Sequence, residues 1–184
     1  LHAPAEILEH RSLKRAPERR ALGVGVDEVI GEGADALAIK TALVPHDCFP
    51  TLALRLERHG RVLSLLTDCG EPREDLGKAL GGAHVLLIEA NHDVQLLRAG
   101  PYPQSLKDRV LGAGGHLSND QMAIMLRRLL SPHLHTVVLL HLSAKNNRPE
   151  IARRVAMEAL EQAGRSDVRV LCAEQDRPLE PLDI

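Results

Sequence analysis

Residues 51–70 read TLALRLERHGRVLSLLTDCG, and this stretch decides the fold. Leucine occupies every second position from 52 to 56, with Arg55 and Glu57 between or beside them, which is the two-residue period of a strand. His59-Gly60 predicts a tight turn, and residues 61–67 predict a returning strand. The sequence therefore predicts a β-hairpin whose second strand runs into the polar residues Thr67 and Asp68.

Further elements are predicted on both sides of this hairpin. The predicted strands span residues 36–44, 84–90, 136–140 and 167–172, and the predicted helices span residues 4–15, 71–80, 118–130 and 147–163. A long connection, residues 91–117, carries one predicted helical piece near 105–111, and the glycine-punctuated stretch 23–33 carries none. Early strands followed by alternating strands and helices predict an α/β (α+β) fold, with residues 1–184 forming a single domain.

Composition limits the class of protein. Apolar residues make up 44% of the 184 residues and charged residues 26%, as in a globular protein, and the near absence of aromatic residues predicts a core of Leu, Val, Ile and Ala. No apolar run approaches the roughly 20 residues of a membrane span. Three cysteines without a CxxC pair favour the reducing cytoplasm over a disulfide framework. The net charge of −2 excludes a strongly basic protein.

Residues that can bind metals follow three of the predicted strands. His46 and Asp47 follow the first, Asp68 ends the second strand of the hairpin, and His141 follows the strand at 136–140. Loops at one edge of a sheet gather such residues, and His with Asp suits a divalent ion such as Zn²⁺ or Mn²⁺. An aspartate shared between two ions can activate a water. Each residue also has an ordinary interpretation, because a strand-end His is often solvated and Asp68 can simply form a turn.

Five segments carry a resemblance to a known family. They are LVPHDC (43–48), LLTDCG (65–70), LIEANHD (87–93), GPYPQSLKDRVLGAGGHLSN (100–119) and LLHLSAKNN (139–147). In this order they resemble motifs of the YycJ-like (WalJ-like) group of the metallo-β-lactamase superfamily. The resemblance implies a four-layer αββα sandwich with two divalent metal ions, zinc or manganese, at one edge.

The resemblance also implies roles for single residues. His46 would be a ligand of the first metal, Asp68 would bridge the two metals, and His141 would bind the second. The implied catalytic residues are Asp68 and His116, and the implied substrate-binding residues are His92, Asn119 and Lys145. Two alternatives stay open: Ser118 or Asn119 can cap the following helix, and Lys145 can belong to the start of the next one.

One motif of the family is missing from the sequence. The superfamily's HxHxDH motif should precede His46, but neither His2 nor His10 has that spacing. We therefore expect an N-terminally truncated sandwich, the C-terminal portion of a longer protein. What remains is one terminal ligand for each metal, His46 or His141, and the shared Asp68. Such a site should bind metal weakly, because a stable catalytic zinc site normally has three protein ligands.

The function implied by the resemblance is metal-dependent hydrolysis of phosphodiesters, and more specifically a cytoplasmic 5′-to-3′ DNA exonuclease that uses a water activated by two metals. Basic residues that could hold the DNA backbone are Arg98, Lys107, Arg109, Lys145 and Arg148. The acidic balance does not favour strong nucleic-acid binding. Two alternatives remain: a hydrolase of a small thioester or lactone, and a non-catalytic truncated domain.

Overall fold

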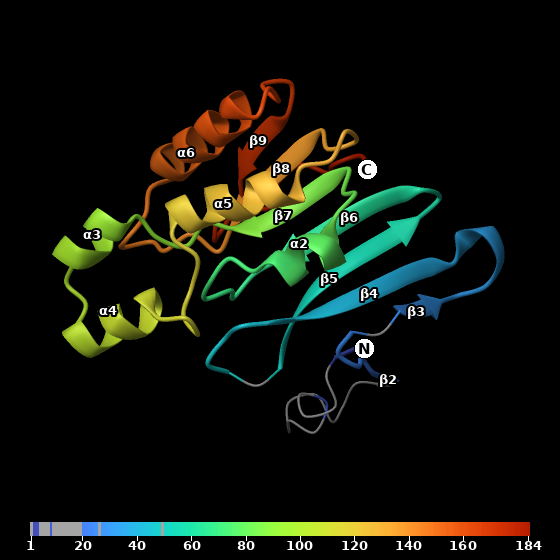
Figure 1. Ribbon diagram of the computed structural model, residues 1–184, viewed down its shortest axis with the longest axis horizontal. Coiled ribbons are helices and arrows are strands. Elements are labelled where there is room, and N and C mark those ends of the chain that lie inside the picture. Colours follow the sequence, from blue (N-terminus) through green and yellow to red (C-terminus); the bar gives the residue numbers. More distant parts are fainter. Residues whose placement is uncertain (1, 4–7, 9–19, 26, 49) are drawn as a thin grey trace.

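A seven-stranded mixed sheet forms the body of the protein in the computed structural model, which describes residues 2–3, 8, 20–25, 27–48 and 50–184. The strands lie in chain order, β3-β4-β5-β6-β7-β8-β9 (Figure 1). Their bounds are β3 Asp27–Ile30, β4 Leu37–Val44, β5 Thr51–Arg58, β6 Arg61–Leu66, β7 Val85–Glu89, β8 Thr136–Leu140 and β9 Arg169–Cys172. Two short strands, β1 (His2–Ala3) and β2 (Arg20–Ala21), form a separate parallel pair.

Strands β3 to β6 pair antiparallel, and the predicted hairpin is β5–β6. His59 and Gly60 both have positive φ angles, 51° and 71°, as a two-residue turn with the twist of the flanking strands requires. Leu54 lies opposite Leu65 in this hairpin. The alternating leucines of the two strands, Leu52, Leu54 and Leu56 of β5 and Leu63 and Leu65 of β6, therefore share one face of the sheet.

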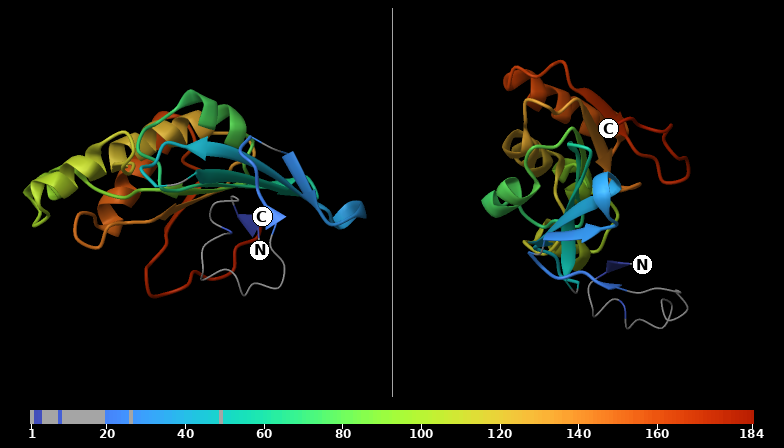
Figure 2. Two further views of the ribbon diagram at one scale, coloured as in Figure 1. Left: turned by 90° about the horizontal axis from the view of Figure 1, so that it is seen from below. Right: turned by 90° about the vertical axis from the view of Figure 1, so that its right-hand side faces the viewer.

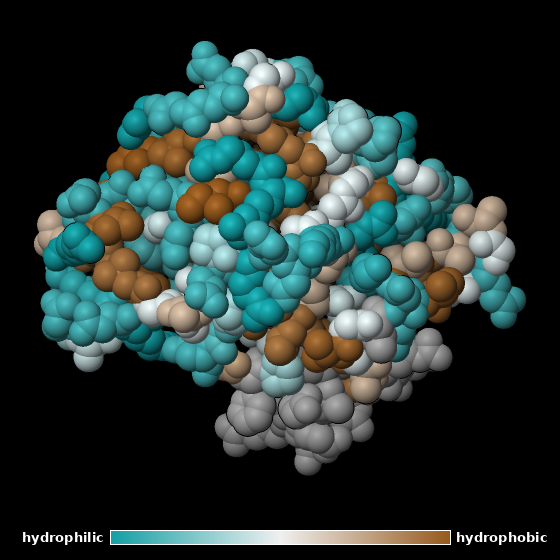
Figure 3. All heavy atoms as spheres, viewed as in Figure 1, coloured by the Kyte–Doolittle hydropathy of each residue, from teal (hydrophilic) through white to brown (hydrophobic). Residues whose placement is uncertain are grey.

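Strands β6 to β9 pair parallel, and the helices lie in the connections between them. The helices are α2 Glu74–Leu80, α3 Val94–Ala99, α4 Gln104–Leu111, α5 Asn119–Leu129 and α6 Pro149–Gln162. Right-handed crossovers that all advance in the same direction place their helices on the same face of the sheet. Accordingly α5 contacts both α2 and α6, and the three helices share one apolar core with β4 to β9. The surface on this side is largely hydrophilic, with apolar side chains in small separate groups (Figure 3).

The opposite face of the sheet is apolar and has no helix of the described residues over it. Leu52, Leu54, Leu56, Leu63 and Leu65 lie on it and are each only partly buried. The C-terminal segment, residues 173–184, lies on this side, away from α2 and α5 (Figure 2).

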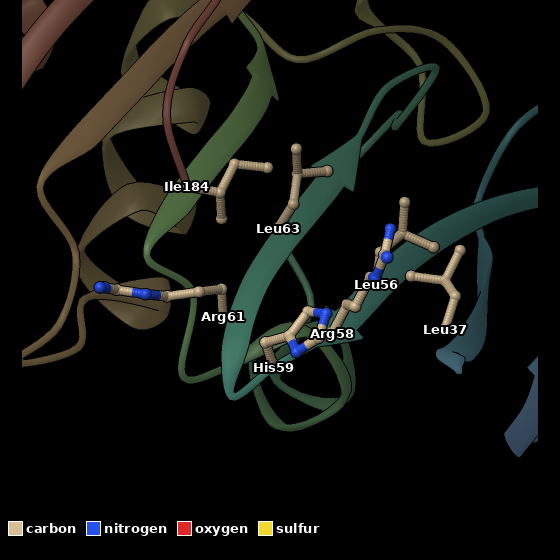
Figure 4. Close-up of a pocket in the computed structure, with 7 residues that line it drawn as sticks. All are labelled: Leu37, Leu56, Arg58, His59, Arg61, Leu63 and Ile184. Atoms are coloured by element: carbon tan, nitrogen blue, oxygen red, sulfur yellow. The ribbon is translucent and has the colours of Figure 1, made fainter. Parts of the chain in front are cut away.

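A cavity of about 530 Å³ lies on this face near the β5–β6 turn, where Ile184 points toward Leu63 (Figure 4). The residues that line it are Leu37, Leu56, Arg58, His59, Arg61, Leu63 and Ile184. With two arginines and no carboxylate side chain among them, they do not suit a cation.

The structure confirms the α/β fold and most of the predicted elements, and it adds short elements that were not predicted, among them the β1–β2 pair, β3 and α3. Strand β3 lies in the glycine-punctuated stretch, and α3 precedes the single helical piece expected in residues 91–117. Asp93 caps α3 by accepting a hydrogen bond from the Leu96 amide at 2.9 Å, a signal that the sequence already contained. Helix α2 begins at Glu74, three residues later than predicted. Pro72 disfavours helical geometry in Glu71, and Arg73, the N-cap residue, has an extended backbone.

Two further expectations bear on the extent of the fold. The helix predicted at 4–15 lies almost wholly outside the described residues. Of the four-layer sandwich, the described residues form one large sheet and one layer of helices, with the β1–β2 pair beside them. No helix in the described part of the chain is long and apolar enough to cross a membrane.

Candidate metal centre

Strands β6, β7 and β8 end at the same edge of the sheet (Figure 1), and polar side chains meet there. Asp68 follows β6, Glu89 ends β7 and His141 follows β8, so the carboxyl ends of neighbouring parallel strands bring them together. His116 reaches the same place from the loop before α5. One donor atom from each of Asp68, Glu89, His116 and His141 lies within 4.8 Å of the others.

The Glu89 side chain is wholly buried and makes hydrogen bonds to both histidines of this cluster. Its Oε1 accepts hydrogen bonds from Nδ1 of His116 at 2.8 Å and Nδ1 of His141 at 2.7 Å. Its Oε2 accepts the backbone amides of Cys69 at 2.9 Å and Leu117 at 3.3 Å. Glu89 therefore joins the ends of β6, β7 and β8 to the loop that carries His116.

Glu89 is charged despite its burial. Burial by itself would raise the pKa of this carboxyl, but the hydrogen bonds from His116, His141 and the Cys69 amide more than offset it and hold the pKa below its ordinary value. The hydrogen bond between Glu89 and His141 also raises the pKa of His141, although burial of the ring opposes this. An anionic Glu89 is thus paired with two imidazoles.

Three imidazoles are held in one tautomer. A carboxylate can only accept, so Nδ1 of His116 and Nδ1 of His141 must donate to Glu89. Nδ1 of His46 likewise donates to the carbonyl oxygen of Gly115 at 3.1 Å. Each ring therefore keeps Nε2 as the nitrogen that can bind a metal or exchange a proton. The ring centroid of His116 lies 5.1 Å from that of His46 and 5.0 Å from that of His141.

Asp68 faces all three rings. Its Oδ1 lies 3.9 Å from Nε2 of His46, 3.8 Å from Nδ1 of His116 and 3.6 Å from Nδ1 of His141. Asp68 and His141 both adopt left-handed backbone conformations, with φ of 53° and 58°. Such angles cost a non-glycine residue about 1–2 kcal/mol and gather at functional sites.

Glycine lets the loop before α5 approach Asp68. A Cβ atom on Gly70 would lie 1.9 Å from the carbonyl oxygen of Ala113, so no larger residue fits. The amide of Asp47 donates to the Gly114 carbonyl at 2.9 Å, and the Asp47 carboxylate pairs with Arg109 of α4. These contacts fix the loop that positions His116 over Asp68.

The structure brings together four of the residues singled out from the sequence, namely His46, Asp68, His116 and His141. Sequence reasoning missed the role of Glu89. The signal was present, because Glu89 is the one charged residue of an otherwise apolar buried strand, VLLIE, and a buried carboxylate needs partners.

The remaining predicted residues lie in other surroundings. His92 is wholly buried, and its ring nitrogens have no hydrogen-bond partner among the described residues. Asn119 is buried and exchanges side-chain hydrogen bonds with Asn147 at 3.0 and 2.9 Å, while Ser118 caps α5. Lys145 is exposed, with its Nζ 5.7 Å from the Tyr102 ring centroid. Their assignment to substrate binding stays a prediction.

The donor set suits a divalent ion. Because the Nδ1 atoms are engaged, the donors that remain are the Asp68 carboxylate and three Nε2 atoms, a borderline-hard set of the kind that binds zinc. Of the neighbouring thiols, Cys69 is buried, which raises its pKa to about 12, and its Sγ donates to the Glu71 carbonyl. Cys69 is therefore a neutral packing residue rather than a thiolate ligand.

Sequence comparison finds related proteins of known name, although no family model matches the chain. The chain is 34% identical over 121 residues to exodeoxyribonuclease YycJ of Bacillus anthracis, a match that covers 66% of this chain and 46% of the relative. It is 38% identical over 120 residues to exodeoxyribonuclease WalJ of Streptococcus pneumoniae, covering 65% and 45%. The chain thus spans about half the length of these relatives.

Comparison with solved structures gives the fold. The metallo-β-lactamase-fold protein YhfI of Bacillus subtilis superimposes with a TM-score of 0.64 and 14% identity, over 94% of this chain and 61% of that one. The metallo-hydrolase Igni18 of Ignicoccus hospitalis gives a TM-score of 0.63, also at 14% identity, over 94% and 64%. Zinc-bound PqqB of Methylobacterium extorquens gives 0.61 at 19% identity, over 98% and 64%.

Proposed function

Taking as premise that this chain belongs to the metallo-β-lactamase-fold proteins and is related to YycJ and WalJ, we propose that the whole protein is a metal-dependent hydrolase of phosphodiesters. We propose DNA as its substrate and 5′-to-3′ exonuclease action as its activity. The observation that carries the proposal is the fixed tautomer of His46, His116 and His141 around Asp68. Imidazoles whose Nδ1–H is held by an oxygen acceptor are the usual ligands of catalytic metals.

His46, Asp68 and His141 are the proposed metal ligands. Zinc or manganese held there would polarise a phosphoryl oxygen and lower the pKa of a water molecule. Three protein ligands are the usual complement of one catalytic ion. A second ion, which a shared Asp68 would allow, needs donors beyond this set.

His116 is the proposed proton donor. Glu89 holds its Nδ1–H and so leaves Nε2 as the nitrogen that exchanges a proton. His116 can then deliver a proton from Nε2 to the leaving oxygen of the cleaved ester, while Asp68 orients the attacking water. In this proposal His116 transfers a proton, whereas His46 and His141 bind metal.

The substrate contacts are proposed with different roles. Lys145 is exposed and can neutralise a backbone phosphate. His92 and Asn119 are buried, so a contact with substrate would require the segments that carry them to open. The chain's three cysteines are free, which agrees with the cytoplasm as the proposed compartment.

A two-part experiment tests the proposal. Metal content is measured by elemental analysis after dialysis, and DNA labelled at the 5′ or the 3′ end is then digested with zinc or manganese added. Early release of the 5′ label, with binding that weakens steeply as salt rises, supports the exonuclease. Hydrolysis of a thioester or lactone without DNA cleavage would instead identify a small-molecule hydrolase. Neither metal nor activity would identify a non-catalytic domain.

A further inference from the structure

Asn91 connects the two loops that carry His116 and His141. Its backbone amide donates to the carbonyl of Leu117, next to His116, at 3.0 Å. Its backbone carbonyl accepts the Ser143 amide at 2.8 Å, and its side-chain Nδ2 donates to the His141 carbonyl at 3.0 Å. Asn91 is itself buried, with 8% of its surface exposed.

The side-chain bond is made where the sheet ends. The last hydrogen bond between β7 and β8 runs from the Ala90 amide to the Leu140 carbonyl. One residue later His141 turns into the left-handed conformation, and its carbonyl is bonded to the Asn91 side chain instead of to a neighbouring strand. With the Ser143 bond, Asn91 holds this turn at two points.

We propose that Asn91 is a positioning residue that holds the His141 ring against Glu89. Loss of the Asn91 amide would leave the His141 carbonyl without this donor and let the turn relax from its left-handed conformation. The His141 ring would then leave Glu89 and lose its fixed tautomer. The inference rests on the proposed metal-dependent function only for its consequence, a weaker metal site.

The test uses the whole chain in two Asn91 variants. Asn91→Ala removes the amide, and Asn91→Ser keeps a small polar group that is too short to reach the His141 carbonyl. The matched control is Ser64→Ala, because Ser64 is also buried and its side chain also donates to a carbonyl, that of Leu80 at 2.7 Å, away from the cluster. Thermal melting of all three variants separates folding from positioning.

The primary measurement is the tautomer of His141 in the metal-free chain, from the ¹⁵N chemical shifts of its ring. We expect the wild type and Ser64→Ala to show a protonated Nδ1, and both Asn91 variants to lose it. In zinc titrations the Asn91 variants should bind about 10–100-fold more weakly, as for other residues that orient metal ligands.

The two proposals fail in distinguishable ways. If the Asn91 variants keep the wild-type His141 shifts, or if Ser64→Ala changes them equally, Asn91 does not position His141. If the tautomer is lost as expected but the wild-type chain does not bind zinc, the positioning holds and the proposed metal site of this chain is wrong.

Discussion

Two groups of three histidines lie at opposite ends of the same strands. At the carboxyl ends, His46, His116 and His141 surround Asp68 and Glu89, with neighbouring ring centroids 5.0 and 5.1 Å apart. At the amino ends of β7 and β8, the ring of His84 lies 5.3 Å from that of His133 and 6.4 Å from that of His135. The spacing is similar, so spacing between histidines does not by itself define a metal site.

The difference lies in what Nδ1 of the central ring contacts, which is His116 in the first group and His84 in the second. In the first group Nδ1 donates to an oxygen and leaves Nε2 free. In the second, Nδ1 of His84 accepts the Val62 amide at 3.1 Å, so the proton must sit on Nε2 and this nitrogen cannot bind a metal. A buried carboxylate that accepts from two of the rings, rather than the number of histidines, distinguishes the first group. We refer to the two groups as the Glu89 cluster and the His84 cluster.

The largest expected effect is the loss of metal from the Glu89 cluster alone. His46→Ala, Asp68→Ala and His141→Ala each remove a proposed ligand and should weaken zinc binding by more than about 100-fold, a larger effect than the loss of a residue that only orients ligands. The matched controls are His84→Ala, His133→Ala and His135→Ala, which should keep the wild-type metal content after dialysis. Metal loss in the control set would overturn the comparison.

The next effect concerns Glu89 itself. Glu89→Gln keeps the shape but removes the charge and places an amide against four donors, so we expect zinc affinity to fall about 10–100-fold. Isothermal titration measures it, and thermal melting of the same sample reports the accompanying loss of stability. Zinc affinity within threefold of the wild type would mean that Glu89 only packs the sheet edge.

His92 gives an intermediate effect, since it lies near Glu89 without a hydrogen bond to it. Burial lowers the pKa of His92 to about 4, so the unfolded chain binds this proton more readily. The contribution to stability is complete above the unfolded pKa, near 6.5, and is lost as the pH falls toward 4, with a size of up to about 3 kcal/mol. His92→Leu should therefore lose less stability than the wild type between pH 7 and pH 4.5 in urea unfolding. Equal losses in both proteins would contradict this.

The smallest effect is a pair of opposite pH dependences. The Glu89 bond raises the pKa of His141, so its contribution is present below about pH 6.5 and is lost as the pH rises through the folded value. Burial, followed by the nearby Arg61, His133 and His135, lowers the pKa of His84. The His84 contribution is therefore present above about pH 6.5 and is lost as the pH falls.

Single substitutions measure the pH-dependent contributions of His141 and His84 to stability. Relative to the wild type, His141→Ala should be most destabilised at acid pH and His84→Ala at alkaline pH. Each difference should stay below about 1 kcal/mol, because both side chains are partly exposed. Urea unfolding at pH 5.5 and pH 8.5 measures both, and differences of the same sign would show that the carboxylate does not separate the two clusters.

The elements predicted from the sequence are largely those of the structure, and the misses have local reasons. The hairpin β5–β6 and the helices α5 and α6 follow from strict periodicity and caps. Strand β3 is short and edge-placed in a glycine-punctuated stretch, and the six residues of α3 are too few for a helical period. Glu89 was missed because a single carboxylate at a strand end carries no spacing signal.

The sequence by itself determined the α/β fold and the identity of His46, Asp68 and His141 as candidates, because side-chain period and strand-end chemistry are local properties. His116 was a candidate only through the family resemblance. Only the tertiary structure decided which histidines share a carboxylate. That choice depends on strand order and on the approach of the Ala113 loop to Gly70, contacts between residues far apart in the chain. It also fixed each tautomer, since a proton's position on an imidazole is set by the partner of its other nitrogen.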